Sequence, residues 1–152
     1  GDVYKRQIYG AGPLSNKIQA LAEKSGVDKH ITLHGAVPNG IDKLYEANCF
    51  VFPSWYEGFS GSLIEAMLSG IPIIASNIPM NMEAIESGKT ALVHEAKNPE
   101  DLADKMKAMI AGYPDMIKMG SNARAVAQER FDIRNIAAQY EKLLHDFNSR
   151  KR

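Results

Sequence analysis

Between Phe50 and Ala75 the sequence passes from an apolar run to a glycine-rich loop, then to a short helical pattern and a second apolar run. The loop contains Glu57, Gly58 and Gly61, and Glu65 follows within the helical pattern. A strand, a glycine loop, a helix and a strand in this order form the unit with which α/β proteins bind phosphate groups at a helix N-terminus. The segment predicts a parallel sheet with an anion-binding edge, and the two glutamates suggest a phosphorylated ligand that also carries hydroxyl groups.

The same alternation continues along most of the chain. Short apolar runs predict strands at residues 8–9, 31–33, 49–52, 71–75 and 91–93. Helical periodicity predicts helices at residues 14–24, 41–47, 62–68, 82–86, 100–110, 116–130 and 133–147. Strands that alternate with helices predict an α/β fold with a Rossmann-like, doubly wound parallel sheet. Ligands bind such sheets at the carboxyl ends of the strands, which is where the glycine loop lies.

The length of 152 residues suits one domain with its own core. Residues 1–7 lack the continuous apolar character of a buried parallel strand, and the sequence has no initiator methionine. We therefore interpret residues 1–7 as a non-native or truncated lead-in. The predicted domain spans residues 8–147, and residues 148–152 are expected to form a basic tail.

Composition excludes several classes of function. The 18 basic and 18 acidic residues give a formal net charge of zero, which argues against nucleic acid as a partner. Cys49 is the single cysteine and favours a reduced, cytoplasmic setting, and no apolar run approaches the roughly 18 residues of a membrane span. The histidines, which we expect on the surface or in loops, lack the spacing of metal ligands, so no metal site is predicted. They are His30, His34, His94 and His145.

Glu65 has two competing explanations. Its carboxylate can accept hydrogen bonds from two neighbouring hydroxyl groups of a ligand, such as those of a ribose. Alternatively, Ser62 and Glu65 have the spacing of a capping box, in which the glutamate bonds back to the serine amide. The residues alone leave both explanations open. Gly58, Gly61 and the small Ser60 allow a ligand to approach the backbone under either of them.

Three further features carry weaker signals. Gly10 and Gly12 begin a dinucleotide fingerprint that fails at Ser15, so we interpret them as a tight turn that also approaches a phosphate. Asn81 is expected to cap the short helix that follows it. Aromatic side chains flank Glu57 and either stack on a base or sugar or pack under the loop. These aromatic residues are Trp55, Tyr56 and Phe59.

Residues 50–76 resemble the signature of the retaining glycosyltransferases of group 1 (family 4), which have the GT-B fold. Flanking motifs at residues 10–14, 31–37, 83–93 and 98–103 agree, so the resemblance covers roughly residues 8–147. It implies that the chain is the C-terminal, donor-binding half of a GT-B fold. The loop departs from the family pattern, in which Gly-Phe-Gly is followed by a small apolar residue and often by proline, because it reads Gly58-Phe59-Ser60-Gly61-Ser62.

The resemblance implies a role for each residue of the site. Glu57 would be catalytic, holding the donor sugar and supporting the positive charge that develops at its anomeric carbon. Glu65 would bind the ribose hydroxyls, the backbone near Val37 would contact the base, and Gly12 completes the donor-binding set. The amides of the loop would face the sugar and the diphosphate. The loop residues are Gly58, Phe59, Ser60, Gly61, Ser62 and Leu63.

The resemblance also implies the partners. The donor would be a nucleotide diphosphate sugar, used as a substrate without a metal or other cofactor. The acceptor would be a glycan or a lipid-linked glycan, bound by an N-terminal domain upstream of this chain, as is the family's Arg/Lys pair. The resemblance further implies a cytoplasmic enzyme, which in its full-length form can associate peripherally with a membrane.

Two alternatives stay open. The chain is either half of an active transferase or a non-catalytic nucleotide-sugar-binding module that needs a separate N-terminal partner. A nucleotide-sugar epimerase is less well supported, because no acid/base group besides Glu57 is evident. In the first case we expect the isolated chain to bind a uridine or guanosine diphosphate sugar weakly and to catalyse no transfer.

Overall fold

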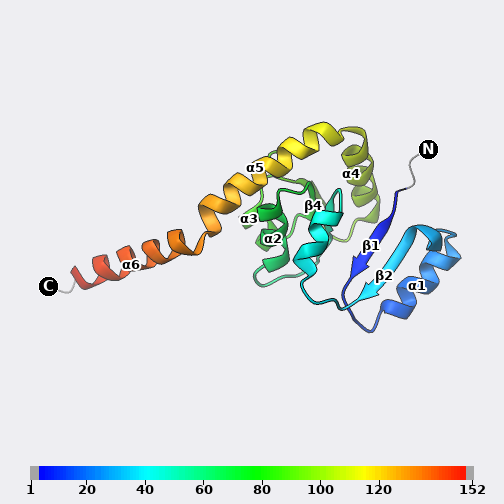
Figure 1. Cartoon of the computed structure of the whole chain (residues 1–152), viewed down its shortest axis with the longest axis horizontal. Helices are drawn as coiled ribbons and strands as arrows, with labels where there is room; N and C mark the ends of the chain where they lie inside the picture. The colour runs from blue at the N-terminus through cyan, green and yellow to red at the C-terminus, as the bar shows by residue number, and fades with distance from the viewer. Residues whose placement is uncertain (1–3, 150–152) are drawn as a thin grey trace. The chain divides into compact units, whose positions relative to one another are not determined.

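The computed structural model describes residues 4–149, which form two compact units. The first unit ends at Asp42 and the second begins at Lys43. Figure 1 labels the helices and strands of both units. The predicted domain from residue 8 to residue 147 therefore spans both of them.

The first unit is a strand–helix–strand segment. Strand β1 (Arg6–Tyr9) pairs in parallel with β2 (Ile31–Gly35), and Ile8 lies opposite Leu33. Helix α1 (Ser15–Lys24) and a 3₁₀ turn (Asp28–His30) connect the strands.

Strand β1 extends the predicted strand at residues 8–9 back to Arg6 and Gln7, whereas the non-native or truncated origin of residues 1–7 stays a prediction. A strand of a two-stranded sheet need not be apolar on both faces, so the rule for buried parallel strands does not apply here. The rest of the predicted lead-in includes residues 1–3, which lie outside the described residues.

The second unit holds a three-stranded parallel sheet in the order β3-β4-β5. Its strands are β3 (Phe50–Phe52), β4 (Ile73–Ser76) and β5 (Leu92–His94), with Ile74 opposite both Val51 and Leu92. Helix α2 (Gly61–Ser69) connects β3 to β4, and α3 (Pro79–Ala84) connects β4 to β5. A 3₁₀ segment (Gly40–Glu46) stands where the sequence predicts a short helix. The α/β fold with parallel strands is confirmed, although the described strands form two sheets.

Three helices follow the sheet: α4 (Pro99–Ala111), α5 (Tyr113–Phe131) and α6 (Ile133–Ser149). Helix α5 begins earlier than predicted, because Pro114 lies in its first turn, where proline is tolerated. Helix α6 extends away from the rest of the second unit (Figure 1), and none of its described residues is buried. It includes Asn148 and Ser149 of the predicted basic tail, whereas residues 150–152 lie outside the described residues.

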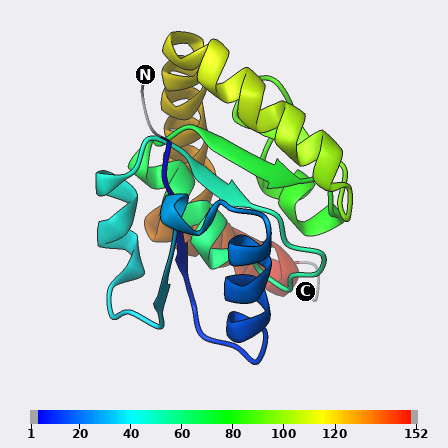
Figure 2. The same ribbon diagram turned by 90° about the vertical axis from the view of Figure 1, so that its right-hand side faces the viewer.

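The core of the second unit lies around β4, every residue of which is buried. Leu63 and Met67 of α2 are fully buried beside it. Helix α2 also packs against α5 (Figures 1 and 2). The small residues Gly120 and Ala123 of α5 are buried there and allow the two helices to approach closely. This packing fixes α2, and with it the loop that leads into its N-terminus.

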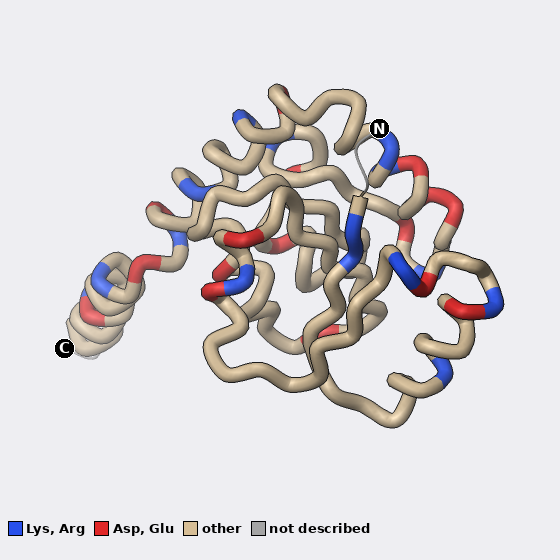
Figure 3. The backbone as a smooth tube through the Cα atoms, turned by 45° about the vertical axis from the view of Figure 1, so that its right-hand side comes forward, with Lys and Arg blue, Asp and Glu red and all other residues tan. Residues whose placement is uncertain are grey.

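Charged residues are interspersed along α4, α5 and α6 (Figure 3). Several form pairs within one helix, such as Lys107 with Asp104 at 2.9 Å and Lys118 with Asp115 at 3.0 Å. Such exposed pairs contribute little to stability. Within residues 4–149 no helix is long and apolar enough to cross a membrane.

Candidate functional site

The carboxyl ends of β3, β4 and β5 meet at one edge of the sheet, because the strands are parallel. The loop after β3 leads into α2 and contains Glu57. The turns after β4 and β5 are joined by two hydrogen bonds. The Asn77 amide donates to the His94 carbonyl at 2.9 Å, and the Ala96 amide donates to Asn77 Oδ1 at 2.8 Å. Three loops are thus brought to the edge at which the sequence predicts a site.

Glu57 and Glu65 are the two carboxylates nearest in sequence to the start of α2. Glu57 is half-buried in the loop, and Glu65 is exposed in the second turn of α2. Among residues 4–149, neither carboxylate has a hydrogen-bond or ion-pair partner. A helical side chain leans toward the helix N-terminus, so Glu65 leans toward Gly61, one turn earlier. Two acceptor groups therefore flank the start of α2 with their hydrogen-bonding capacity unused.

The predicted capping box does not form. Helix α2 begins at Gly61 and has Ser60 as its N-cap, so Ser62 and Glu65 do not occupy the two positions that a capping box requires. Ser60 makes no side-chain cap hydrogen bond either. Of the two explanations for Glu65, the structural one is wrong.

Backbone amides at the start of α2 are also unused. Leu63 and Ile64 donate to the Ser60 carbonyl at 3.0 and 3.1 Å. The amides of Gly58, Phe59, Ser60 and Ser62, by contrast, donate to no acceptor in the described part of the chain. Unpaired amides at a helix N-terminus carry partial positive charge and bind anions.

The two loop glycines leave the backbone open. A Cβ atom built on Gly58 or Gly61 meets nothing within 4 Å, and neither residue has a positive φ. Neither the backbone conformation nor packing within the described residues therefore requires glycine at these positions. Both positions leave room for a ligand to approach the backbone.

The aromatic side chains beside Glu57 do not pack under the loop. Trp55 is 67% exposed, Tyr56 is 89% exposed and Phe59 is 74% exposed. The Lys97 ammonium lies 5.4 Å from the centre of the Trp55 ring, and Phe59 meets the edge of Phe131 at 6.4 Å. Of the two explanations, stacking against a ligand is the one that this exposure leaves available.

Two residues at this edge differ from their predicted roles. Asn81 lies inside α3 and is fully buried, so it does not cap that helix, whose N-cap is Ile78. His94 is 2% exposed at the end of β5, which corrects the expectation of a surface position. Its Nδ1 donates to the Glu95 carbonyl at 2.8 Å, and its Nε2 has no partner among the described residues.

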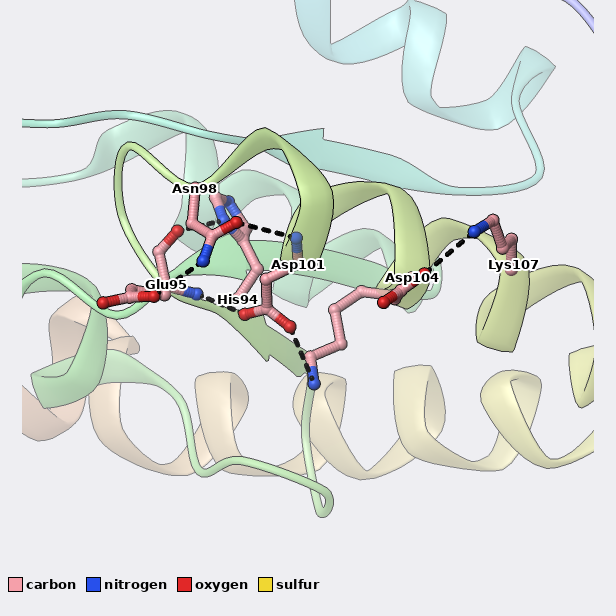
Figure 4. Close-up of polar contacts among 7 residues, drawn as sticks. His94, Glu95, Asn98, Asp101, Asp104 and Lys107 are labelled. Carbon is pink, nitrogen blue, oxygen red and sulfur yellow. Dashed lines mark hydrogen bonds and ion pairs between the residues drawn. The ribbon is translucent and has the colours of Figure 1, made fainter.

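The turn from β5 into α4 is held by a compact set of hydrogen bonds (Figure 4). Asn98 caps α4 by accepting from the Asp101 amide at 2.9 Å, and Asp101 accepts from the Glu95 amide at 2.7 Å. The hydrogen bond from Glu95 holds the pKa of Asp101 below its ordinary value. The nearby Lys105 ammonium, at 3.4 Å, acts in the same direction. These contacts fix the loop that carries Lys97.

Gly12 and Val37 lie in the first unit. Gly12 is exposed, and its carbonyl accepts from the Ser15 amide at 3.2 Å and from Ser15 Oγ at 2.9 Å, as expected of a tight turn. Val37 is half-buried after β2. Their roles toward a ligand stay predictions.

Residues 4–149 contain no group of three or more histidine, cysteine, aspartate or glutamate side chains able to hold a metal ion. The expectation that the chemistry needs no metal stays a prediction. The candidate site described above consists of carboxylates, backbone amides and aromatic rings around the N-terminus of α2.

Comparison with known proteins identifies the family. The model of the group 1 glycosyl transferases matches residues 1–126. The chain belongs to this family. It is 32% identical over 146 residues to the poly(ribitol-phosphate) alpha-N-acetylglucosaminyltransferase of Staphylococcus aureus, covering 95% of this chain and 29% of the relative. It is 31% identical over 143 residues to spore coat protein SA of Bacillus subtilis, covering 88% and 38%. The chain thus spans well under half the length of these relatives.

Solved structures agree on the fold. The crystal structure of S. aureus TarM matches with a TM-score of 0.82 at 29% identity, over 91% of this chain and 28% of that one. The structure of Anabaena HepE in complex with UDP matches with a TM-score of 0.85 at 21% identity, over 94% and 41%. Such neighbours are GT-B glycosyltransferases, and this chain corresponds to their C-terminal type of domain. The predicted family and fold are confirmed.

Proposed function

We propose that this chain is the donor-binding half of a retaining glycosyltransferase, which moves a sugar from a nucleotide diphosphate sugar to a glycan or lipid-linked acceptor. One observation carries the proposal. Glu57 and Glu65, whose carboxylates have no partner within residues 4–149, lie in sequence on either side of the two open glycines and of amides that are likewise unpaired in that range. A nucleotide diphosphate sugar combines the anion and the hydroxyl groups that such donors and acceptors complement.

The diphosphate is proposed to bind at the N-terminus of α2. The amides of Gly58, Ser60 and Ser62 would donate to its oxygens, with the positive end of the helix dipole behind them. The same donors would stabilise the negative charge that grows on the diphosphate as it departs. Open space at Gly58 and Gly61 allows the oxygens to reach hydrogen-bonding distance.

The two carboxylates are proposed to hold the two polyhydroxylated ends of the donor. Glu57 would accept from the hydroxyls of the transferred sugar and, as the catalytic residue, stabilise positive charge at the anomeric carbon. Glu65 would accept from the ribose hydroxyls. The Trp55 ring lies two residues from Glu57 and offers a stacking surface for a sugar ring.

The proposed chemistry is a displacement on one face of the donor sugar. The bond between the anomeric carbon and the diphosphate oxygen breaks, and the acceptor hydroxyl oxygen bonds to that carbon from the same face. Because the acceptor bonds from the face that the diphosphate leaves, the configuration is retained, and the hydroxyl proton passes to the departing diphosphate. No metal takes part in this proposal.

Known relatives support a uridine diphosphate donor. HepE has been solved with UDP and with UDP-glucose, and the S. aureus relative is an N-acetylglucosaminyltransferase. The acceptor is proposed to bind a further domain, because this chain covers 29% and 38% of its two relatives. We expect this chain alone to bind the donor without transferring its sugar.

Calorimetry with UDP-glucose, UDP-N-acetylglucosamine and GDP-mannose tests the proposal. We expect one of them to bind, and Glu57→Gln to weaken it by about tenfold or more, the equivalent of one charge-assisted hydrogen bond. The melting temperature should change little, since Glu57 has no partner among the described residues. Glu141→Gln, the same change at an exposed position of α6, is the matched control. Absence of heat with every ligand would contradict the proposal.

A further inference from the structure

A chain of buried hydrogen bonds lies beneath the loop that carries Glu57. It joins Ser54, Ser60, Ser76 and Asn81, and we call it the Asn81 bridge. Asn81 and Ser76 are fully buried, and Ser60 is 5% exposed. All four residues belong to the second unit.

Asn81 is the centre of the bridge. Its Nδ2 donates to the Ser76 carbonyl and to Ser76 Oγ, both at 3.0 Å. Its Oδ1 accepts from Ser60 Oγ at 3.1 Å. Ser76 Oγ in turn donates to the Ser54 carbonyl at 2.5 Å. Helix α3 is thereby connected to the end of β4 and to both ends of the loop.

The directions of these hydrogen bonds are fixed by their partners. The Ser76 carbonyl can only accept, so Nδ2 of Asn81 must face it and Oδ1 must face Ser60. The Ser54 carbonyl also only accepts, so the Ser76 hydroxyl must donate to it. The side-chain polar atoms of Ser60, Ser76 and Asn81 all have partners in the bridge, and a satisfied buried network holds its members in one arrangement.

The bridge holds the loop by hydrogen bonds on both sides of Glu57. Ser54 lies three residues before Glu57, and Ser60 lies three residues after it. Between them, Trp55 contacts Lys97 and Phe59 contacts Phe131, but Glu57 itself has no partner in the described chain. The position of the Glu57 carboxylate therefore depends on how firmly the two ends of the loop are held.

We infer that Asn81 is a positioning residue for Glu57, acting through Ser60 and Ser76 to hold the loop in the form that binds the donor sugar. This role rests on the proposed function of Glu57. Loss of the bridge would free the loop and weaken recognition of the sugar. Binding of the nucleoside diphosphate would lose the support of the loop amides of Gly58 and Ser60 but would keep the amide of Ser62 and the carboxylate of Glu65, which lie in α2, so we expect it to weaken less.

Two variants and one control test this role in the chain of 152 residues. Asn81→Asp keeps the shape but puts an acceptor against the Ser76 carbonyl, which breaks that contact. Ser60→Ala removes one hydrogen bond and serves if Asn81→Asp does not fold. The control is Thr90→Ala. Thr90 is 4% exposed and bonds to Glu86 at 2.8 Å before β5, at the other end of the sheet.

Two readouts separate positioning from a general loss of stability. The first is amide hydrogen exchange of residues 54–60 in the free chain, with the anisotropy of Trp55, the single tryptophan, as a second probe. The second is the affinity for the nucleotide sugar that binds the wild-type chain, relative to its nucleoside diphosphate. We expect the bridge variants to speed exchange at residues 54–60. They should also lower the ratio of the two affinities, which measures the preference for the nucleotide sugar, about tenfold, while the control changes neither quantity.

The possible outcomes are distinct. Unchanged exchange at residues 54–60 in the bridge variants would overturn the positioning role. An unchanged preference for the nucleotide sugar in the bridge variants would also overturn the positioning role, but the proposed function would stand. No binding of either ligand by the wild-type chain would overturn the proposed function and this role with it.

Discussion

The two ends of α2 both carry glycines, but their surroundings differ. At the C-terminal end Gly70 has a φ of +77°, and its carbonyl lies against α5 where a Cβ on Gly120 would overlap it. At the N-terminal end a Cβ on Gly58 or Gly61 meets nothing within 4 Å, and neither residue needs a positive φ. One end requires glycine for the fold, and the other does not.

The difference separates residues that serve the packing of this short helix from residues that we propose bind the ligand. At the end that packs on α5, the Gly70 carbonyl lies so close to Gly120 that the glycines serve the packing of the two helices. The other end offers unpaired amides and carboxylates that contribute nothing to the described fold. Substitutions at the packed end should change stability, and substitutions at the open end should change binding.

Gly120→Ala should have the largest effect. The added Cβ would overlap the Gly70 carbonyl oxygen and lie 3.0 Å from the carbonyl carbon of Ile71, both backbone atoms. We expect a loss of about 3 kcal/mol or more in the free energy of unfolding. Chemical denaturation measures it, with the exposed Ser121→Ala in the same helix as control. A stability equal to that of the control would show that α2 and α5 do not meet closely here.

Glu65→Gln should have the second-largest effect, and it tests the N-terminal end of α2, which we call the open end. It removes the charge without changing the shape, and Glu65 has no partner within residues 4–149. The affinity for both the nucleotide sugar and its nucleoside diphosphate should fall about tenfold, as expected for a hydrogen-bonded carboxylate. Melting temperature should stay the same. A lower melting temperature with unchanged affinity would assign Glu65 to the structure.

Gly61→Ala should change stability little and binding clearly. Alanine suits the first turn of a helix better than glycine, so the free energy of unfolding should rise by at most about 1 kcal/mol. The added methyl group would fill the space through which the ligand approaches, and the affinity should fall. Denaturation and calorimetry on one preparation measure both quantities. A clear loss of stability would remove the contrast between the two ends.

Asp132→Asn should have the smallest effect, beside the packed end. Asp132 and Leu68 line the same shallow pocket, and the Arg134 guanidinium lowers the pKa of Asp132 from 3.8 to about 2. A lowered pKa stabilises the fold above pH 3.8, and this stabilisation is lost as the pH falls through about 2. The melting temperatures of wild type and variant should therefore differ slightly at pH 5 and converge by pH 2. A constant difference would contradict the pairing with Arg134.

Most helices and strands could be predicted because their patterns are local. Helix α4 begins at Pro99, as the capping Asn98 and the first-turn proline indicate. Strand β1 was harder, since Arg6 and Gln7 look polar unless the two-stranded sheet is known. The start of α2 was missed by one residue, and that residue decides whether Ser62 and Glu65 form a capping box.

The candidate site was only partly accessible from the sequence. The motif predicts the loop with Glu57 and the helical position of Glu65. The Asn81 bridge, by contrast, depends on contacts between residues far apart in the chain. One local signal existed. Asn81 lies three residues after Ile78 and four before Ile85, both buried, so helical periodicity turns it toward the core. A polar residue there needs buried partners, which only the folded chain reveals.

Amide chemical shifts of the ¹⁵N-labelled chain, followed while the nucleotide sugar is added, test the central claim most directly. They report where the ligand binds, residue by residue. The largest changes should fall on residues 58–63 at the open end of α2, with residues 67–70 and 120–124 at the packed end unchanged. Changes confined to another surface, with residues 58–63 unaffected, would contradict the account.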